Sequence, residues 1–304
     1  MFRYRFVAAL AIGSFVGLPV AGGAHATTID APSVPRDVLY VSDFANDDVL
    51  AFDASPRAKN RQPLLTIPVG AHPSGLWVDR HGVLYVAAYE SVLEYKPGAT
   101  APFRTITAGV TGAVALTVDA AGTLYVVNHS GQNVTVVEYS AGSRRPAQTL
   151  TITEPDSLFG FAGGITFDAA GNLYVAATFY PEANGRVFRF APGQTTGTDL
   201  GLSAVGSQDG LAIDAKGNLY VGYFGPVEVY APGATQPSAT IGKGSDYPSL
   251  FALSPQGVLY EPVTAGIPSN SSLVEFGTNP SKQVDHIGGF FSAPVGAAVR
   301  SAAF

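Results

Sequence analysis

Short hydrophobic stretches separated by turn residues recur along most of the chain. One of them, Leu-Tyr-Val or in its last copy Leu-Tyr-Glu, begins at residues 39, 84, 124, 173, 219 and 259. Successive copies follow at intervals of 40 to 49 residues. This period is typical of β-propellers, in which each repeat supplies one four-stranded blade. The pattern therefore predicts an all-β, six-bladed β-propeller.

The order of elements within one repeat is clearest in the fifth copy. It predicts a first strand at 210–214, a second at 218–223, a third at 227–230 and a fourth at 238–241. The first strands are apolar almost throughout, as in Leu76-Trp77-Val78. Continuous apolarity, rather than alternation, is expected for strands that are buried between neighbouring blades.

The first repeat lacks its first strand, and the last repeat is followed by one strand too many. Residues 294–300 (Pro-Val-Gly-Ala-Ala-Val-Arg) are similar to residues 73–79 (Pro-Ser-Gly-Leu-Trp-Val-Asp) but precede no second strand. We expect residues 294–300 to pair with residues 38–42. A C-terminal strand would then complete the first blade and remove the exposed edges of a linear array.

The first 26 residues have the pattern of a secretory signal peptide. Arg3 and Arg5 precede an apolar run at 6–20, and Ala24-His25-Ala26 is a small-x-small cleavage site. The alternative, an uncleaved membrane anchor, is disfavoured because the run is shorter than the roughly 20 residues of a span. We predict residues 1–26 as signal peptide, residues 27–304 as a single propeller domain, and a secreted protein, extracellular or periplasmic.

The charge and the cysteine content of the chain exclude several classes of function. The chain has 17 Lys and Arg against 23 Asp and Glu, a net charge of −6, with no basic run. This balance argues against binding nucleic acid through its phosphates. The absence of cysteine excludes disulfides, thiolate metal sites and a cysteine nucleophile. No segment after the signal peptide is long and apolar enough to span a membrane, and we expect a monomer.

Residues 73–86 have the pattern Pro-x-Gly-Leu-x-Val-Asp-x-x-Gly-x-Leu-Tyr-Val, which resembles the NHL repeat. More broadly, residues 34–300 are similar to the six-bladed propellers that include the SMP-30/gluconolactonase and virginiamycin B lyase groups. The resemblance implies the fold. It implies little about activity, because the shared residues are those that build blades.

Four aspartates stand three residues before a glycine, at 79, 119, 168 and 214. A ring of metal-binding carboxylates is one interpretation. The favoured interpretation is a tight turn, in which aspartate accepts backbone N–H groups and glycine takes a positive φ. Ser254, at the matching place before Gly257, supports the turn because serine caps in the same way.

Topology indicates where a site would lie. Loops that lead into first strands and loops that leave second strands lie at one end of every blade, around one mouth of the central channel, where ligands commonly bind. Polar and aromatic residues that depart from the repeat at these positions are the candidate ligand-binding residues. They are Asp43, Asn46, His72, Asn128, His129, Tyr180, Glu182, Asp209 and Tyr247.

Two functions remain open. The first is a binding module for a small molecule, glycan or peptide at the channel mouth. The alternative is a metal-dependent hydrolase or lyase, similar to the lactonase and virginiamycin B lyase groups, with Ca²⁺, Mg²⁺ or Zn²⁺ bound by Asp43, His72, His129 and Asp209. The two histidines can equally be hydrogen-bonded loop residues. Catalytic motifs such as Gly-x-Ser-x-Gly are absent.

The signal-peptide interpretation predicts a mature chain that begins at Thr27. N-terminal sequencing of protein collected from the culture supernatant or periplasm measures this directly. A chain that still begins at Met1 and is recovered with membranes would contradict the prediction and favour the anchor.

Overall fold

The computed structural model describes residues 37–55, 61–154, 157–181, 184–203, 208–223, 226–242, 250–264, 271–277 and 283–300. These residues form β-strands and no helix, and thus no helix with the length and hydropathy needed to cross a membrane. Residues from Val34 onward group into one compact unit. The predicted signal peptide lies outside the described residues.

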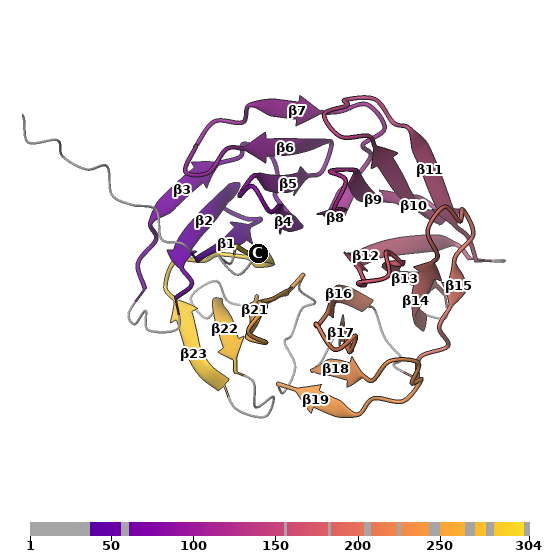
Figure 1. Cartoon of the computed structure of the whole chain (residues 1–304). Helices are drawn as coiled ribbons and strands as arrows, with labels where there is room; N and C mark the ends of the chain where they lie inside the picture. The colour runs from indigo at the N-terminus through magenta and orange to yellow at the C-terminus, as the bar shows by residue number, and fades with distance from the viewer. Residues whose placement is uncertain are drawn as a thin grey trace, which may run out of the picture. The chain divides into compact units, whose positions relative to one another are not determined.

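The strands form six antiparallel four-stranded sheets, which are the blades (Figure 1). From the innermost strand outward, blade one consists of β24 (Pro294–Arg300), β1 (Val38–Asp43), β2 (Asp48–Asp53) and β3 (Leu65–Pro68). Blade two consists of β4 (Leu76–Val78), β5 (Leu84–Ala88), β6 (Ser91–Tyr95) and β7 (Arg104–Ile106). Blade three consists of β8 (Ala113–Val118), β9 (Leu124–Ser130), β10 (Asn133–Tyr139) and β11 (Gln148–Ile152). Blade four consists of β12 (Phe159–Phe167), β13 (Leu173–Tyr180), β14 (Asn184–Phe190) and β15 (Thr198–Asp199). Blade five consists of β16 (Gln208–Ile213), β17 (Leu219–Tyr223), β18 (Val227–Tyr230) and β19 (Ala239–Ile241). Blade six consists of β20 (Ala252–Leu253), β21 (Leu259–Val263), β22 (Ser272–Phe276) and β23 (Gln283–Gly288).

The innermost strands contact one another in succession and return to the first. The order is β24, β4, β8, β12, β16, β20 and again β24. Figure 1 shows these strands towards the middle and the fourth strands, such as β7 and β19, at the rim. The predicted six-bladed propeller is therefore confirmed.

The closing strand is also confirmed. Strand β24 pairs antiparallel with β1, so that Val38 lies opposite Arg300 and Tyr40 opposite Ala298. The predicted segment and its partner are both correct, and β1 extends one residue further, to Asp43.

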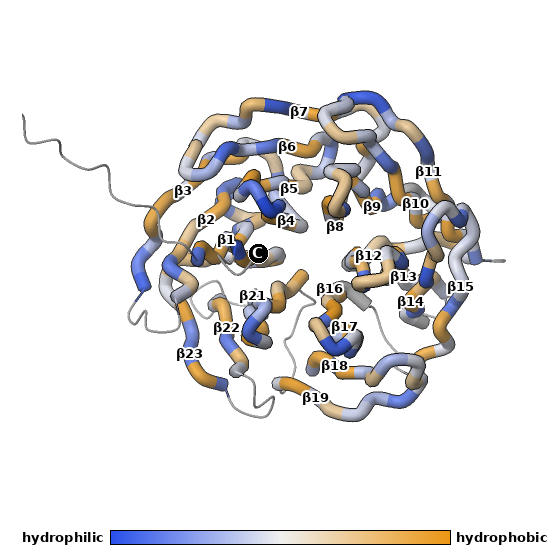
Figure 2. Tube along the Cα trace, in the orientation of Figure 1, coloured by the Kyte–Doolittle hydropathy of each residue, from blue (hydrophilic) through white to orange (hydrophobic). Residues whose placement is uncertain are grey.

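The hydrophobic core is divided into six layers, one between each pair of neighbouring blades. Each cluster of buried apolar residues combines side chains from two adjacent blades. Figure 2 accordingly shows hydrophobic residues in all six blades. The Leu-Tyr-Val strands supply both sides: Leu39 and Val41 face blade six, whereas Tyr40 faces blade two. A strand buried on both faces explains the unbroken apolar pattern of the repeat.

The aspartate-glycine turns are structural. In blade four, Oδ1 of Asp168 accepts the N–H groups of Ala170 and Asn172 at 2.9 Å each, and Oδ2 accepts the Tyr174 hydroxyl at 3.1 Å. Gly171 has a φ of 81°. The same backbone contacts recur at Asp79, Asp119 and Asp214. The repeat tyrosine of blades two to five thus contacts the carboxylate of its own turn, and the turn interpretation is confirmed.

Two glycines permit the close approach of inner strands. A Cβ atom at Gly296 would lie 2.2 Å from the carbonyl oxygen of Ser74, and one at Gly75 would lie 2.6 Å from that of Val114. Any larger residue would force neighbouring blades apart. The Pro-x-Gly sequence that begins these strands is therefore a requirement of packing.

We expect that removal of residues 294–304 lowers the free energy of unfolding by several kcal/mol, because a strand buried on both faces is lost and β1 becomes a free edge. Thermal unfolding followed by circular dichroism measures the loss. A chain that ends at Arg300 is the matched control, because it keeps all of β24. Equal melting temperatures for the two truncated chains would contradict the closure.

Candidate functional site

We use the term top face for the end of the ring at which the innermost strands begin and the second strands end. Blade four extends furthest there, because β12 has 9 residues whereas β4 has 3. Along the start of β12 the side chains of Phe159 and Phe161 are exposed, and Gly160 and Ala162 between them are buried. This alternation places both phenylalanine rings on one side of the extension.

The exposed rings form one contiguous surface. Phe159 stacks on Tyr180, its cross-strand partner, with ring centroids 4.7 Å apart and an interplanar angle of 18°. Phe161 contacts both rings edge-on and stacks on His129 of blade three at 5.0 Å. Such offset and edge-to-face pairs are the preferred arrangements of aromatic groups.

Blade two continues this surface. A Cβ atom at Gly112 would lie 3.7 Å from Cε2 of Tyr89 and 3.5 Å from Cβ of His129. Tyr89 and His129 thus both lie close to Gly112. We call Tyr89, His129, Phe159, Phe161 and Tyr180 the aromatic arc, which spans blades two to four.

Tyr89 is displayed in a strained backbone conformation. It lies in the two-residue turn between β5 and β6 with a φ of 48°, and its side chain is 55% exposed. Turns of this kind favour asparagine or glycine, which adopt positive φ easily. Among the described residues the other non-glycine residue with positive φ is Asp47, also in a top-face turn. Strain at an exposed aromatic residue is typical of binding surfaces rather than of blade building.

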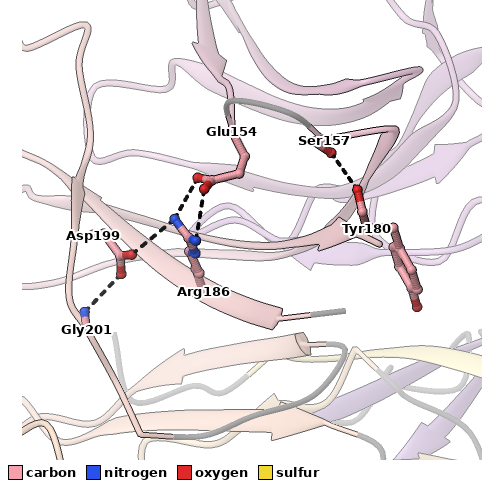
Figure 3. A network of polar contacts seen from close by, with 6 residues as sticks. All are labelled: Glu154, Ser157, Tyr180, Arg186, Asp199 and Gly201. Atoms are coloured by element: carbon pink, nitrogen blue, oxygen red, sulfur yellow. Dashed lines mark hydrogen bonds and ion pairs between the residues drawn. The ribbon is translucent and has the colours of Figure 1, made fainter. Parts of the chain in front are cut away.

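An ion-pair network fixes the segment that leads into β12 (Figure 3). The guanidinium of Arg186 binds both carboxylate oxygens of Glu154, at 2.6 and 3.0 Å, and lies 3.7 Å from Oδ2 of Asp199. Ser157 donates its hydroxyl to the backbone oxygen of Tyr180 at 3.2 Å. Figure 3 shows the ring of Tyr180 pointing away from these ion pairs. The network anchors the extension and leaves its rings free.

Exposed apolar side chains are concentrated on the top face. The large hydrophobic residues that are exposed within the described chain are Phe44, Leu64, Tyr89, Phe103, Leu158, Phe159, Phe161 and Val284. Five of them belong to top-face turns or to the start of β12. Single exposed apolar residues are ordinary, whereas a contiguous patch marks a site of interaction.

The carboxylate of Asp43, a candidate ligand, is fully occupied by protein donors. It accepts the N–H groups of Ala45 at 3.1 Å, Asn46 at 3.3 Å, Ser292 at 2.6 Å and Ala293 at 2.9 Å. The Asn46 side chain adds a fifth bond at 3.0 Å. Asp43 and Asn46 are thus brought together, as a clamp between the first turn and the segment before β24.

The negative charges at this turn shift the pKa of the neighbouring Asp48. Burial, together with the charges of Asp43 and Asp47, raises the pKa of Asp48 to about 6. Three aspartates thus lie close together at this end of blade one.

Two further candidates have different environments. Asn128 is buried and binds the loop before β8, donating to the carbonyl oxygen of Gly109 at 2.9 Å and accepting from the Thr111 N–H at 3.3 Å. His72 is exposed, stacks on Phe44 with centroids 4.4 Å apart, and places Nδ1 3.1 Å from Asp47. The structure thus brings His129 and Tyr180 together in the arc and puts His72 in a separate pair.

The remaining candidates are not described. Glu182 and Tyr247 lie outside the described residues, as does the side chain of Asp209. Among described residues, no three histidine or acidic side chains are grouped so as to hold a metal ion. Since the oxygens of Asp43 already accept five hydrogen bonds, this carboxylate does not fit a divalent cation.

Sequence reasoning missed Phe159 and Phe161. Phe179, which precedes Tyr180 in β13, is buried in the layer between blades three and four. The signal for the arc was present as Phe-Gly-Phe at 159–161. It was overlooked because the repeat predicts a first strand that begins only at Gly164.

A cleft lies between blades three and four at the opposite end, lined by Tyr125, Glu138, Phe167 and Pro192 among others. Its volume of about 90 Å³ is well below the 300 Å³ or more of typical ligand pockets. Its aromatic lining belongs to the repeat, since Tyr125 packs edge-on against Phe167. We therefore assign it to blade packing.

Glu261 stands where the other five repeats have valine. Its side chain is only 6% exposed and faces blade five, with Oε2 3.6 Å from the position of a Cβ atom on Gly242. Burial raises the pKa of this carboxyl group from 4.5 to about 7. The chain thus keeps an acidic group within an otherwise apolar layer.

Comparisons with known proteins show the fold. No family model and no curated protein matches the sequence. A protein of unknown function from Bacteroides caccae has a TM-score of 0.66 at 12% identity, covering 87% of this chain and 99% of that one. Hydrazine synthase of Kuenenia stuttgartiensis has a TM-score of 0.59 at 19% identity, covering 80% and 81%. A proposed 6-phosphogluconolactonase from Bacteroides uniformis has a TM-score of 0.54 at 17% identity, covering 84% and 83%.

These TM-scores show a shared fold at low sequence identity. The expected resemblance to gluconolactonase-type propellers is confirmed at the level of the fold, since proposed lactonases are among the similar structures.

Glu261 makes stability dependent on pH. Because its pKa is higher in the folded than in the unfolded chain, the folded state binds more protons between pH 4.5 and about 7, and stability falls as pH rises through that window. Glu261→Gln removes the titrating group. We expect the variant to be more stable than the wild type by about 3 kcal/mol at pH 8 and nearly equal at pH 4.5. Urea unfolding at both pH values measures this, and an equal difference at both would contradict it.

Proposed function

We propose that this propeller is a ligand-binding protein whose site is the aromatic arc at the mouth of the ring. The observation that carries the proposal is that aromatic rings of blades three and four stack into one surface, with the exposed ring of Tyr89 of blade two beside it across Gly112. Building the blades does not require Phe159 and Phe161, because they lie in an extension of β12, which is longer than every other innermost strand. A rigid scaffold that presents variable turn residues is the usual way in which propellers and similar folds bind ligands.

The arc is suited to binding rather than to bond cleavage. Its residues offer flat apolar faces and hydroxyl groups. Its one imidazole, that of His129, has no carboxylate partner within the described chain; its ring stacks on Phe161. Acid–base chemistry would need a positioned donor and acceptor on either side of a reacting bond.

A metal-dependent hydrolase or lyase remains the alternative. It is favoured by the likeness in fold to proposed lactonases. Such a site would depend on Glu182 and Asp209, which the described side chains do not include. Metal analysis of the purified protein tests it: a stoichiometric divalent ion supports this alternative.

The proposal includes export. The predicted signal peptide at residues 1–26 would deliver the propeller to the periplasm or the medium, where a ligand-binding protein meets extracellular compounds.

A ligand screen by thermal shift tests the proposed function. The library contains small metabolites, oligosaccharides and peptides, and the proteins are the wild type and the double variant Phe161→Ala/Tyr180→Ala. We expect at least one ligand to raise the melting temperature of the wild type, with the rise lost in the variant, because stabilisation by a ligand requires its binding site.

Phe103→Ala is the matched control, since Phe103 is also an exposed phenylalanine (46%) but precedes β7, at the rim. It should respond to ligands as the wild type does. Ligands that stabilise the double variant and the wild type equally would place the site elsewhere and refute the proposal.

A further inference from the structure

We propose that the ligand of the aromatic arc is an uncharged polysaccharide chain that lies across blades two to four. This inference rests on the proposed function and deepens it. It follows from four properties of the arc: its extent, the pairing of its backbone, its charge and the polar groups of its rings.

The residues of the arc follow one another along the ring. Its rings come from the turn after β5, the end of β9, the start of β12 and the end of β13, in that order along neighbouring blades. The exposed members, Tyr89, Phe159 and Phe161, are 39% to 55% accessible. A compact ligand would need an enclosing pocket, whereas a row of open rings suits a long chain that meets each ring in turn.

The backbone beneath the rings is already paired. The Ala113 N–H donates to Tyr89 at 2.7 Å, that of His129 to Gly112 at 2.9 Å, and that of Gly160 to Gly131 at 3.0 Å. Leu158 likewise donates to Tyr180 at 2.8 Å. A peptide that added itself as a strand would need free N–H and C=O groups, so this mode of peptide binding is disfavoured.

The charge of the top face disfavours anionic polymers. Among the described lysines and arginines, Arg186 is the one in top-face strand ends and turns, and its charge is engaged by Glu154 and Asp199. Glu90 is exposed next to Tyr89, and blade one adds the acidic turn at Asp47 and Asp48. Uronate or sulfate groups and nucleic acid would meet repulsion here, without the cations that normally neutralise them.

Sugar rings complement this surface chemically. A pyranose has a face of C–H groups bordered by hydroxyls, so it needs an aromatic face with polar groups at the edge. Tyr89 and Tyr180 carry a polar group at the ring edge, and these hydroxyls make no hydrogen bond to other described residues. One face of the Tyr180 ring is stacked on Phe159, which leaves the other face for a sugar. The amphipathic character of tyrosine makes such contacts favourable without the desolvation of a charge.

Affinity electrophoresis of the mature protein through gels that contain soluble neutral polysaccharides tests the proposal. Xylan, glucomannan, β-glucan and starch are the probes, with heparin and alginate as anionic polymers. We expect retardation by at least one neutral polysaccharide and by neither anion. Phe161→Ala should weaken the binding about tenfold, as expected for loss of one stacking contact, and Phe103→Ala should not.

Calorimetry with oligosaccharides of the retained polymer then tests the extended binding mode. Tyr89→Asn keeps the backbone conformation, because asparagine tolerates positive φ. It should weaken the binding of a hexasaccharide about tenfold and leave that of a disaccharide on blade four unchanged. An equal effect on both lengths would contradict a chain that spans three blades.

The two proposals fail separately. Arc-dependent binding of a proline-rich peptide or of heparin, without binding of neutral polysaccharides, would overturn the polysaccharide inference and leave the proposed function standing. If no ligand in the thermal-shift screen depends on Phe161 and Tyr180, both proposals are wrong.

Discussion

The closure of the ring by β24 is the constraint on which the rest of the structure depends. Joining segments some 250 residues apart costs on the order of 5 kcal/mol of chain entropy. The ladder between β1 and β24 offsets this, and the Asp43 carboxylate adds bonds from the Ser292 and Ala293 N–H groups. Each such bond to a charged group contributes roughly 1.5–3 kcal/mol. The carboxylate of Asp43, which the sequence indicated as a candidate ligand-binding group, therefore helps to hold the ring closed.

Closure divides the molecule into a part that must repeat and a part that can vary. Inner strands approach so closely that Gly75 and Gly296 have no room for a side chain, and six apolar layers lock the blades together. The five residues of the aromatic arc belong to none of these layers, so they can change without unfolding the ring. The aromatic arc uses this freedom, and the strained conformation of Tyr89 is supported by the rigid blades around it.

The blades could be predicted from the sequence because every blade needs the same buried strands and the same tight turns at a regular interval. Burial on two faces explains the Leu-Tyr-Val strands, and the tight turns between strands explain the Asp-Gly pattern. Ring closure explains the additional strand at residues 294–300. The site was less predictable, because departure from the repeat has two causes that look alike. Asp43 and Asn128 differ from the repeat because their side chains bind backbone groups. His129 and Tyr180 differ from it because their rings form part of the arc. Only the direction of the side chain separates these cases. Phe161 was missed because β12 begins before its repeat does.

The central claim is that a closed, rigid ring displays the arc as a preformed surface for a neutral sugar chain. A crystal structure of the protein with a bound neutral hexasaccharide tests it most directly. The account predicts sugar rings stacked on Tyr89, Phe161 and Tyr180 in succession, with the backbone of β9, β12 and β13 unmoved. Electron density for the sugar in the centre of the ring or on the outer strands, with the arc bare, would contradict it.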